Sequence, residues 1–327
     1  MSREMPRILT FRELPPRWQA DCVLLLHNAF GSSWDPRAMS RPGFERIYPR
    51  PSEYVGVCAV DRGRVVSAVL VHRFPFRTRR TDGICSGLGA VATLPTHAGR
   101  GLARSLIEEV HRRERRSGSP FVLLYTGRSI VAHSLYEGLG YHDVLDFPRA
   151  ARLAPKTLRP LPRGWRWRRA VPDDRRSIEE LRTEMGRTRF GFTREGVDWW
   201  PVPPQWFAAG PLDWFVLEHD RSIVGYAGFT TEGQVRVSNE GMARTDAARS
   251  FLSRSLEREA SGSWLVIGSS LFHELRDVPG MRAYSVVKGS YSVLMARSLE
   301  GRPSRSGLIH ELGTDRPDFL IGVADAF

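Results

Sequence analysis

The chain has 327 residues, 41% of them apolar, and its formal net charge is +12. This length predicts two domains of ordinary size, and the apolar fraction is enough for packed cores, which excludes wholesale disorder. No run of about 18 apolar residues is present and the N-terminus lacks the apolar core of a signal peptide, so neither a membrane span nor secretion is expected. The three cysteines, Cys22, Cys58 and Cys85, form neither a disulfide framework nor a zinc pattern. We therefore expect a cytoplasmic protein without a metal site.

The positive charge comes almost entirely from arginine, because Lys156 and Lys288 are the only lysines. A basic chain favours an anionic partner, and nucleic-acid binding would depend on the arginine clusters at 77–80, 112–116 and 163–169. Solvated surface charge is the alternative interpretation of these clusters. A small anionic ligand also suits a basic protein, and we do not expect a nucleic-acid partner.

The first part of the chain favours a sheet with one helix. In chain order we expect a strand over 7–13, a helix over 18–30, an irregular aromatic stretch over 31–54, and strands over 54–60 and 64–73. Asp61-Arg62-Gly63 joins the last two strands, because Asp-x-Gly between apolar runs is typical of a hairpin.

A strand, a glycine-rich turn and a helix follow. The strand covers 83–92, Gly99 and Gly101 mark the turn, and Leu102 begins an apolar pattern of helical spacing. The first N–H groups of a helix have no partner inside the helix and carry the positive end of its dipole, so an anion binds well there. The turn therefore predicts a phosphate site. A P-loop motif is absent, and Arg104 stands where the third glycine of G-x-G-x-x-G belongs, which argues against a dinucleotide fold.

A second strand and helix complete this region. Residues 121–125 (FVLLY) favour a buried strand, and residues 132–138 favour a short helix that ends before Tyr141. The chain from residue 83 to residue 138 thus predicts two blocks, a strand, turn and helix followed by a strand and helix. Two such blocks in this order are more specific for one fold than either block alone.

Two motifs in these blocks resemble the Gcn5-related N-acetyltransferase (GNAT) family. The coenzyme loop of that family reads Q/R-x-x-G-x-G/A; Gly101 and Ala103 match its small positions, whereas Ala98 replaces the opening Gln or Arg. The later helix reads N-x-x-A-x-x-L-Y-x-x-x-G-F in the family. The corresponding residues here are Ser129, Ala132, Leu135, Tyr136, Gly140 and Tyr141. The stretch VATLPTHAGRGL is also similar to the enhanced-intracellular-survival branch of aminoglycoside and lysine acetyltransferases.

The second half repeats the element order of the first. We expect strands over 165–170, 215–218, 223–230, 234–238, 264–267 and 291–296, and helices over 172–185 and 246–260. This repetition suggests an internal duplication. Residues 148–164 contain four prolines and predict a linker. Residues 242–246 hold no glycine and include the acidic Asp246, so we expect a single coenzyme site, in the first half.

The resemblance implies an α/β (α+β) fold of two tandem GNAT-type domains, each a mixed central sheet flanked by helices. We expect a catalytic domain over 1–152, a linker over 153–163, a degenerate GNAT-like domain over 164–300, and a tail over 301–327 that is able to reach the active site. The second domain would be structural and would close the acceptor pocket.

The resemblance also implies acetyl-CoA as co-substrate and indicates the residues of its site. The expected coenzyme-binding residues are Val91, Ala92, Thr93, Gly99, Arg100, Gly101, Leu102, Ala103, Arg104 and Ser129. The backbone of 91–93 would align the pantetheine arm and donate to the thioester carbonyl, and the turn would take the pyrophosphate. Tyr136 is the expected general acid, because a phenol with a pKa of about 10 stays protonated at neutral pH. A packed core tyrosine is the alternative interpretation.

A general base is harder to assign, because the strand over 83–92 lacks the Glu that many relatives use. In the enhanced-intracellular-survival branch the terminal carboxylate is the base, and we expect the Phe327 carboxylate in that role. His27, His97 and His133 are alternatives, of which His97 is expected to shape the turn. That branch carries a third domain, for which too few residues remain here.

These expectations describe an acetyl-CoA-dependent N-acetyltransferase that modifies a primary amine of a small molecule, a lysine or a peptide N-terminus. A mycothiol-synthase-like enzyme is a second reading, since such synthases also pair two GNAT domains. A non-catalytic acyl-CoA-sensing or nucleic-acid-binding protein is a third, which the missing Glu and Ala98 would favour. A homo-oligomer is compatible with each reading, and no membrane partner is expected.

Overall fold

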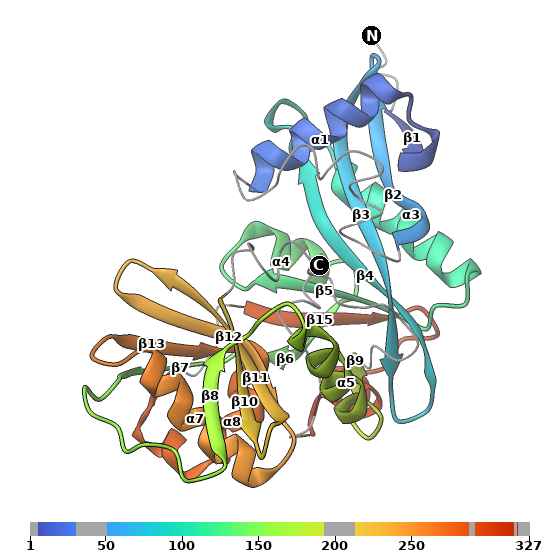
Figure 1. The fold of residues 1–327 in the computed structure, drawn as a ribbon. Coiled ribbons are helices and arrows are strands. Elements are labelled where there is room, and N and C mark those ends of the chain that lie inside the picture. Colours follow the sequence, from blue (N-terminus) through green and yellow to red (C-terminus); the bar gives the residue numbers. More distant parts are fainter. Residues whose placement is uncertain (1–5, 31–50, 193–212, 288–291, 317–318, 320–327) are drawn as a thin grey trace.

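The computed structural model describes residues 6–30, 51–192, 213–287, 292–316 and Phe319. Its strands are β1 (Arg7–Thr10), β2 (Pro51–Asp61), β3 (Arg64–Arg77), β4 (Asp82–Thr93), β5 (Phe121–Gly127), β6 (His142–Asp146), β7 (Arg149–Leu153), β8 (Trp165–Arg169), β9 (Gly191–Phe192), β10 (Asp213–His219), β11 (Ser222–Glu232), β12 (Val235–Ala243), β13 (Trp264–Gly268), β14 (Ser285–Val287) and β15 (Ser292–Ser298). Its α-helices are α1 (Pro16–Phe30), α3 (Leu102–Arg116), α4 (Val131–Glu137), α5 (Asp174–Gly186), α7 (Asp246–Glu259), α8 (Ser269–Leu275) and α9 (Arg305–Leu312). Figure 1 shows two sheets, each with helices packed against it.

The first sheet has the strand order β1-β2-β3-β4-β5-β15-β6, with β9 beside β3. Only β4 and β5 pair in parallel among the described strands of this sheet. The β2–β3 hairpin turns at Arg62 and Gly63, whose φ angles are 48° and 74°. Positive φ at both central residues is what a tight two-residue hairpin turn requires, so the expected turn at Asp61-Arg62-Gly63 is confirmed.

The second sheet has the order β14-β7-β13-β12-β11-β10-β8, and β12 and β13 are its parallel pair. Read from its other edge, this order repeats that of the first sheet strand for strand. The expected α/β class with a repeated mixed sheet is therefore confirmed. No helix in the described part of the chain is both long and apolar enough to cross a membrane.

Each sheet contains a strand from the other half of the sequence, and the two-residue β9 of the second half also pairs with β3 of the first sheet. β7 follows β6 in the chain but lies between β13 and β14 of the second sheet. β15 comes from the second half but lies between β5 and β6 of the first sheet. The boundaries expected around 152–164 and at 300 stay a prediction, because each sheet contains a strand from the other half of the sequence.

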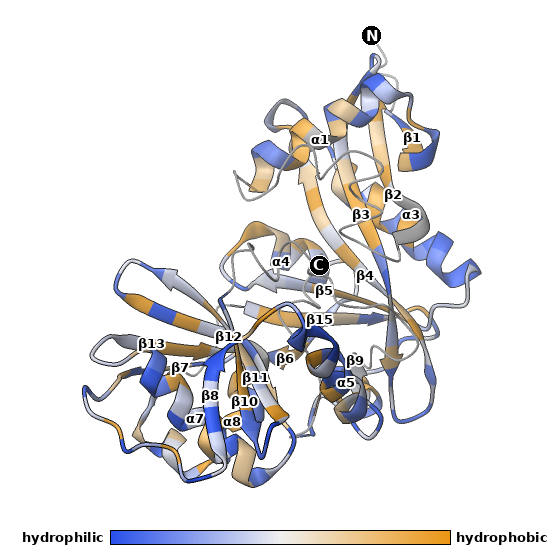
Figure 2. Ribbon diagram, in the orientation of Figure 1, coloured by the Kyte–Doolittle hydropathy of each residue, from blue (hydrophilic) through white to orange (hydrophobic). Residues whose placement is uncertain are grey.

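Helices cover both faces of the first sheet. Leu25 and Leu26 of α1 pack on one face, whereas Leu106 and Val110 of α3 pack on the other face together with α4. Each such side chain contributes roughly 1.5–3 kcal/mol when it is fully buried. Figure 2 shows the apolar residues along the central strands and a hydrophilic β8 at the edge of the second sheet. Charged side chains on an edge strand protect it from pairing with other chains.

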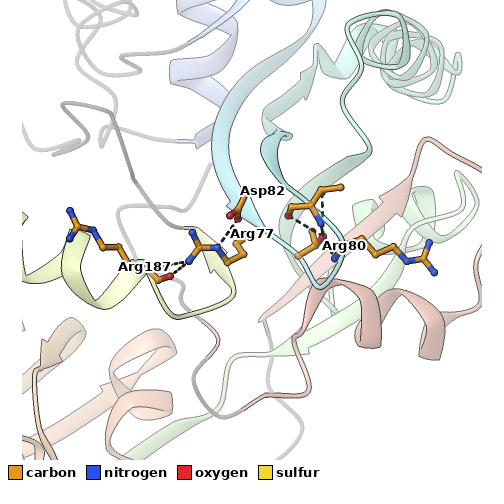
Figure 3. Close-up of polar contacts among 7 residues, drawn as sticks. Arg77, Arg80, Asp82 and Arg187 are labelled. Carbon is orange, nitrogen blue, oxygen red and sulfur yellow. Dashed lines mark hydrogen bonds and ion pairs between the residues drawn. The ribbon is translucent and has the colours of Figure 1, made fainter.

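The long β3–β4 hairpin forms an arm that contacts the second half of the chain. Arg77 donates from Nε to Asp82 Oδ1 at 2.6 Å and also hydrogen bonds the carbonyl of Arg187, just after α5 (Figure 3). Arg79 donates to the carbonyl of His310 in α9 at 2.7 Å. The arm therefore attaches α5 and α9 to the first sheet.

The structure shortens one expected strand and adds two elements that the sequence did not predict. The strand expected over 7–13 ends at Thr10, because Thr10 and Glu13 form a capping box around a short 3-10 helix. Residues 149–153, expected in the linker, form β7. Part of the expected tail is helical, because Ser304 caps α9 and two of its leucines are buried. The aromatic stretch over 31–50 lies outside the described residues.

Candidate functional site

The site expected in the first half is built on the point where β4 and β5 separate. The two strands pair in parallel only where Ser86–Leu88 faces Val122–Leu124, although β4 continues to Thr93 and β5 to Gly127. Ala90 lies at a register shift between β3 and β4 and has a φ of 49°, in the left-handed region. A non-glycine residue in that region is strained, and such strain often marks a functional site. The strain here lies where the strands separate.

Ser67 of β3 holds the end of β4 beyond the register shift at Ala90. Its hydroxyl donates to the carbonyl of Ala92 at 3.0 Å and lies 2.8 Å from the hydroxyl of Thr93. Ala92 is buried on the α1 side, and Val91 packs against the core under α3. The backbone of the three expected residues, Val91, Ala92 and Thr93, is therefore held along one edge of the separation.

The turn after β4 presents an open helix start. Gly99 and Gly101 have φ angles of 72° and 75°, and a Cβ on either residue would meet no atom within 4 Å. Gly101 is the N-cap of α3, and within the described part of the chain no side chain caps the first turn. The N–H groups of Leu102 and Ala103 therefore lie uncapped at the positive end of the helix dipole. This arrangement fits an anionic group of the size of a phosphate.

Asp61 attaches this turn to the β2–β3 hairpin. Its Oδ2 lies 3.1 Å from His97 Nε2 and 3.7 Å from a guanidinium nitrogen of Arg100. The hydrogen bond with His97, followed by the charge of Arg100, holds the pKa of Asp61 below its ordinary value. His97 Nδ1 is in turn 2.9 Å from the Thr96 hydroxyl. His97 thus shapes the turn, as expected, and both of its ring nitrogens are engaged.

Arg104 connects the two helices on this face. Its Nη1 donates to the carbonyl of Gly138, just after α4, at 3.1 Å. A Cβ on Gly138 would lie 3.0 Å from Arg104 Nη2, so glycine lets the guanidinium approach closely. Arg104 therefore holds α3 and α4 together and is less available to a ligand than its position in the sequence implies.

Tyr136 of α4 lies in the core between the two helices. Its side chain is 6% exposed, and its ring centroid is 5.9 Å from that of Tyr141. Burial raises the pKa of Tyr136 to about 12. The phenol stays protonated at any physiological pH and can act only as a hydrogen-bond donor or acid. Ser129, expected at the start of this helix, is exposed in the turn before α4.

The candidates for the general base differ in how the protein engages them. His133 lies 2.9 Å from Asp143 Oδ1 and 3.6 Å from Glu137 Oε2, so carboxylates face both ring nitrogens. His27 lies on α1 and has further contacts. Phe327 lies outside the described residues.

Sequence reasoning missed Asp61 and Ser67 as parts of this site. Asp61 was interpreted only as a turn residue, and its second role depends on the proximity of His97, 36 residues later. Ser67 is a polar residue in an apolar strand, and that contrast is the one local signal that could have identified it. The strained Ala90 has no signal in the sequence.

Comparisons with known proteins agree with this geometry. Residues 11–143 match the family model described as acetyltransferase (GNAT) domain. No curated protein sequence matches the chain significantly. A GCN5-related N-acetyltransferase from Kribbella flavida superposes with a TM-score of 0.65 at 19% identity, over 90% of this chain and 71% of that one.

Two further solved structures show the same fold. A probable N-acyltransferase from Enterococcus faecalis has a TM-score of 0.67 at 15% identity, over 91% of this chain and 73% of its own. Eis1 from Mycobacterium abscessus has a TM-score of 0.56 at 16% identity, over 90% of this chain and 73% of its own. The enhanced-intracellular-survival branch is thus one structural neighbour among several.

Proposed function

We propose that this chain, whose residues 11–143 form a GNAT acetyltransferase domain, transfers the acetyl group of acetyl-CoA to a primary amine. The amine would belong to a small molecule, a lysine or a peptide N-terminus. GNAT enzymes are N-acyltransferases that use acyl-CoA donors. The observation that carries the proposal is the separation of β4 from β5 beside the open start of α3, within the matched domain.

The residues at this place fit the coenzyme. A Cβ on Gly99 or Gly101 would meet no atom within 4 Å, which supports room for a diphosphate at this turn, and the N–H groups of 102–104 would supply donors and a positive potential. The end of β4 over 91–93 would hold the pantetheine arm along its free backbone edge. When bound, the coenzyme supplies an activated acetyl group and a good leaving thiol.

The chain itself contributes a proton donor in Tyr136. A pKa of about 12 exceeds the ordinary thiol value of about 8.5, so complete proton transfer to a thiolate is uphill. Tyr136 therefore acts by donating a hydrogen bond to the leaving sulfur, which lowers the negative charge that develops there. Its ring is held in the core that α3 and α4 cover.

The base in this proposal is the Phe327 carboxylate. His97 and His133 are both engaged by carboxylates, which supports looking elsewhere. Phe319 is buried, with its ring centroid 6.1 Å from that of Phe76 at the arm of the first sheet. Eight residues span at most about 29 Å when fully extended, which sets the upper limit of the distance between Phe319 and the proposed base.

An acceptor screen with a free-thiol readout tests the function. Thiol release that requires both acetyl-CoA and an amine is the expected result. The Gly101→Glu variant serves as the control, because it removes the coenzyme site and leaves the remaining surface intact. A protein that binds acetyl-CoA but releases no thiol with small amines, lysine peptides or peptide N-termini would contradict the proposal.

A further inference from the structure

A second cavity of about 730 Å³ lies beyond the coenzyme turn, between α3, the turn after α4, the end of β15 and residues 301–303. We call it the arginine cavity. Its arginines are Arg104, Arg115, Arg297 and Arg302. Arg104 lies at the end next to the coenzyme turn. Arg115 is eleven residues further along α3, about 16 Å at 1.5 Å per residue, so the cavity extends well past that turn.

The positive charge in the arginine cavity exceeds the negative charge, because four arginines and two glutamates line it. Among the described residues, no carboxylate lies within ion-pair distance of any of the four guanidinium groups, although Glu108 and Glu137 also line the cavity. Arg115 and Arg104 each donate to a backbone carbonyl, those of Leu299 and Gly138. By contrast, the buried Arg182 and Arg189 lie within ion-pair distance of Glu240 and Glu274.

The guanidinium group of Arg297 is held in place by hydrogen bonds with neighbouring residues. Its Nη1 donates to the carbonyl of Leu139 and lies 3.0 Å from Nδ1 of His111. Burial lowers the pKa of His111 to about 3, so the neutral ring can accept this hydrogen bond. His111 Nε2 then lies 2.8 Å from the Tyr141 hydroxyl. A buried network therefore holds the half-buried guanidinium of Arg297 at the wall of the cavity.

The charges of the arginines act on one another. Burial lowers the pKa of Arg297, and the nearby charges of Arg115 and Arg302 lower it further, whereas Tyr141 and Glu108 act in the opposite direction. Bringing like charges together costs free energy unless an anion is present. This is the pattern of a binding site and differs from a solvated surface, where arginines spread apart or pair.

We propose that the arginine cavity binds a phosphate-bearing anion, with Arg115, Arg297 and Arg302 as its donors. Guanidinium groups match phosphate oxygens with two parallel hydrogen bonds, and several of them favour an anion with more than one charge. The phosphate has two possible sources. One is the ribose 3′-phosphate of the coenzyme, which rests on the proposed function, and the other is a separate nucleotide or phosphorylated metabolite.

Calorimetry with pyrophosphate as the probe tests the cavity without turnover. The test variant is Arg115→Glu combined with Arg302→Glu, since both side chains are exposed and their replacement leaves the core unchanged. The matched control is Arg116→Glu, which makes the same charge change on the same helix outside the cavity lining. Loss of charge-assisted hydrogen bonds should weaken binding roughly tenfold or more in the double variant and less than about twofold in the control.

Two further measurements distinguish the sources of the phosphate. If it belongs to the coenzyme, coenzyme A should bind the wild type more tightly than 3′-dephospho-coenzyme A, and the double variant should lose this preference. If it belongs to a separate anion, pyrophosphate should still bind when the protein is saturated with coenzyme A. Either result supports the proposal that the arginine cavity binds phosphate.

Other outcomes would overturn the proposal that the arginine cavity binds phosphate. Pyrophosphate binding that the double variant does not weaken, together with no preference between the two coenzymes, would show that the cavity binds no phosphate. Equal weakening by the Arg116→Glu control would show a general effect of net charge. Failure of the acceptor screen leaves this test intact, because pyrophosphate binding is measured without a reaction.

Discussion

The two halves of the molecule share one backbone plan but differ in whether the helix start is open. In both halves the parallel strands separate near a register shift: β4 leaves β5 after Leu88, and β12 leaves β13 after Ser238. Gly101 leaves the start of α3 without a side-chain partner. In the second half, the Thr245 hydroxyl accepts a hydrogen bond from the N–H of Ala248 at 3.1 Å, and Asp246 adds a negative charge. A short polar side chain therefore occupies what would be the phosphate position.

The helices beside the separated strands, α4 and α8, also differ in whether their side chains fill the space next to the strand. In α8 and just after it, Leu271, Leu275 and Val278 are buried at a spacing of four and three. Ala132 and Tyr136 of α4 begin the same spacing in the first half. A Cβ on Gly241 of β12 would lie 2.9 Å from Leu271 Cδ1, so this leucine packs directly on the separated strand.

Side chains at a few positions therefore decide whether the space beside the separated strand is open or packed in this fold. Glycine and alanine leave the first site open, whereas threonine and leucine fill the second. The second half can then serve as structure, because its own separated strand is packed.

The largest effect is expected from closing the open helix start. Gly101→Glu forces a side chain into a left-handed conformation and puts a carboxylate where the phosphate should lie. Coenzyme affinity should fall at least ~100-fold by calorimetry. Gly118→Glu is the matched control, because Gly118 follows the other end of α3 with a φ of 76° and open space beside it. Equal losses in both variants would mean that strain in α3, not the site, is responsible.

Removal of the proton donor in α4 should have the next largest effect. Tyr136→Phe keeps the ring and its packing and lacks the hydroxyl, so loss of the hydrogen bond to the leaving sulfur should lower turnover by ~10–100-fold while coenzyme affinity stays close to the wild type. Steady-state kinetics and calorimetry together measure the two quantities. Wild-type turnover would identify Tyr136 as a core residue like its counterpart Leu275.

A smaller effect is expected when the first half is made to resemble the second. Ala132→Leu introduces the side chain that Leu271 supplies in α8, and overpacking of this kind costs about 1–3 kcal/mol. The coenzyme should bind roughly tenfold more weakly, since the leucine would fill the space beside β4. The control is Ser134→Leu, at an exposed position on the same helix. If only stability changes and binding does not, the separation of β4 from β5 is not the pantetheine site.

The smallest effect concerns acid stability in the second half. The hydrogen bond from Arg168 lowers the pKa of Asp174 despite its burial, and the N–H of Val171 adds to the shift. Because the folded pKa lies below the unfolded value of about 3.9, the stabilisation is complete above that pH and is lost as pH falls through the folded pKa. Asp174→Asn should lower the free energy of unfolding at pH 7 by about 1–2 kcal/mol.

Urea titrations between pH 2 and pH 7 measure this difference, which should shrink toward the acid end. The neighbouring Asp173 is exposed, and Asp173→Asn should change stability by less than ~0.5 kcal/mol. Coenzyme affinity should be the same in both variants. A loss of coenzyme binding in Asp174→Asn alone would give the second half a direct part in the site.

Local chemistry explains what could be predicted from the sequence. The Asp61-Arg62-Gly63 turn, the helix from Leu102 and the strand over 121–125 depend on neighbouring residues, and the structure has each of them. The place of β15 in the first sheet could not be predicted, because pairing with β5 is a contact between distant segments. The hydrogen bond between Asp61 and His97 is also a contact between segments that are distant in the sequence, so it could not be predicted either.

Within the candidate site, residue types were easier to predict than their partners. Gly101 was identified by its motif, and the structure shows it at the start of α3. Arg104 was expected at the phosphate, but its guanidinium lies against Gly138, because the distance between α3 and α4 is set by packing. The amino-acid sequence contains no local signal for the distance between α3 and α4.

The exchange of β7 and β15 constrains how the protein can be made and divided. Ala296 pairs with Leu123, a separation of about 170 residues, so the first sheet cannot be completed until almost the whole chain has left the ribosome. During synthesis, β5 and β6 would present unpaired edges of the kind that promote aggregation. A fragment cut between the halves would keep those edges permanently, and neither half could be expressed, inherited or replaced as a separate module.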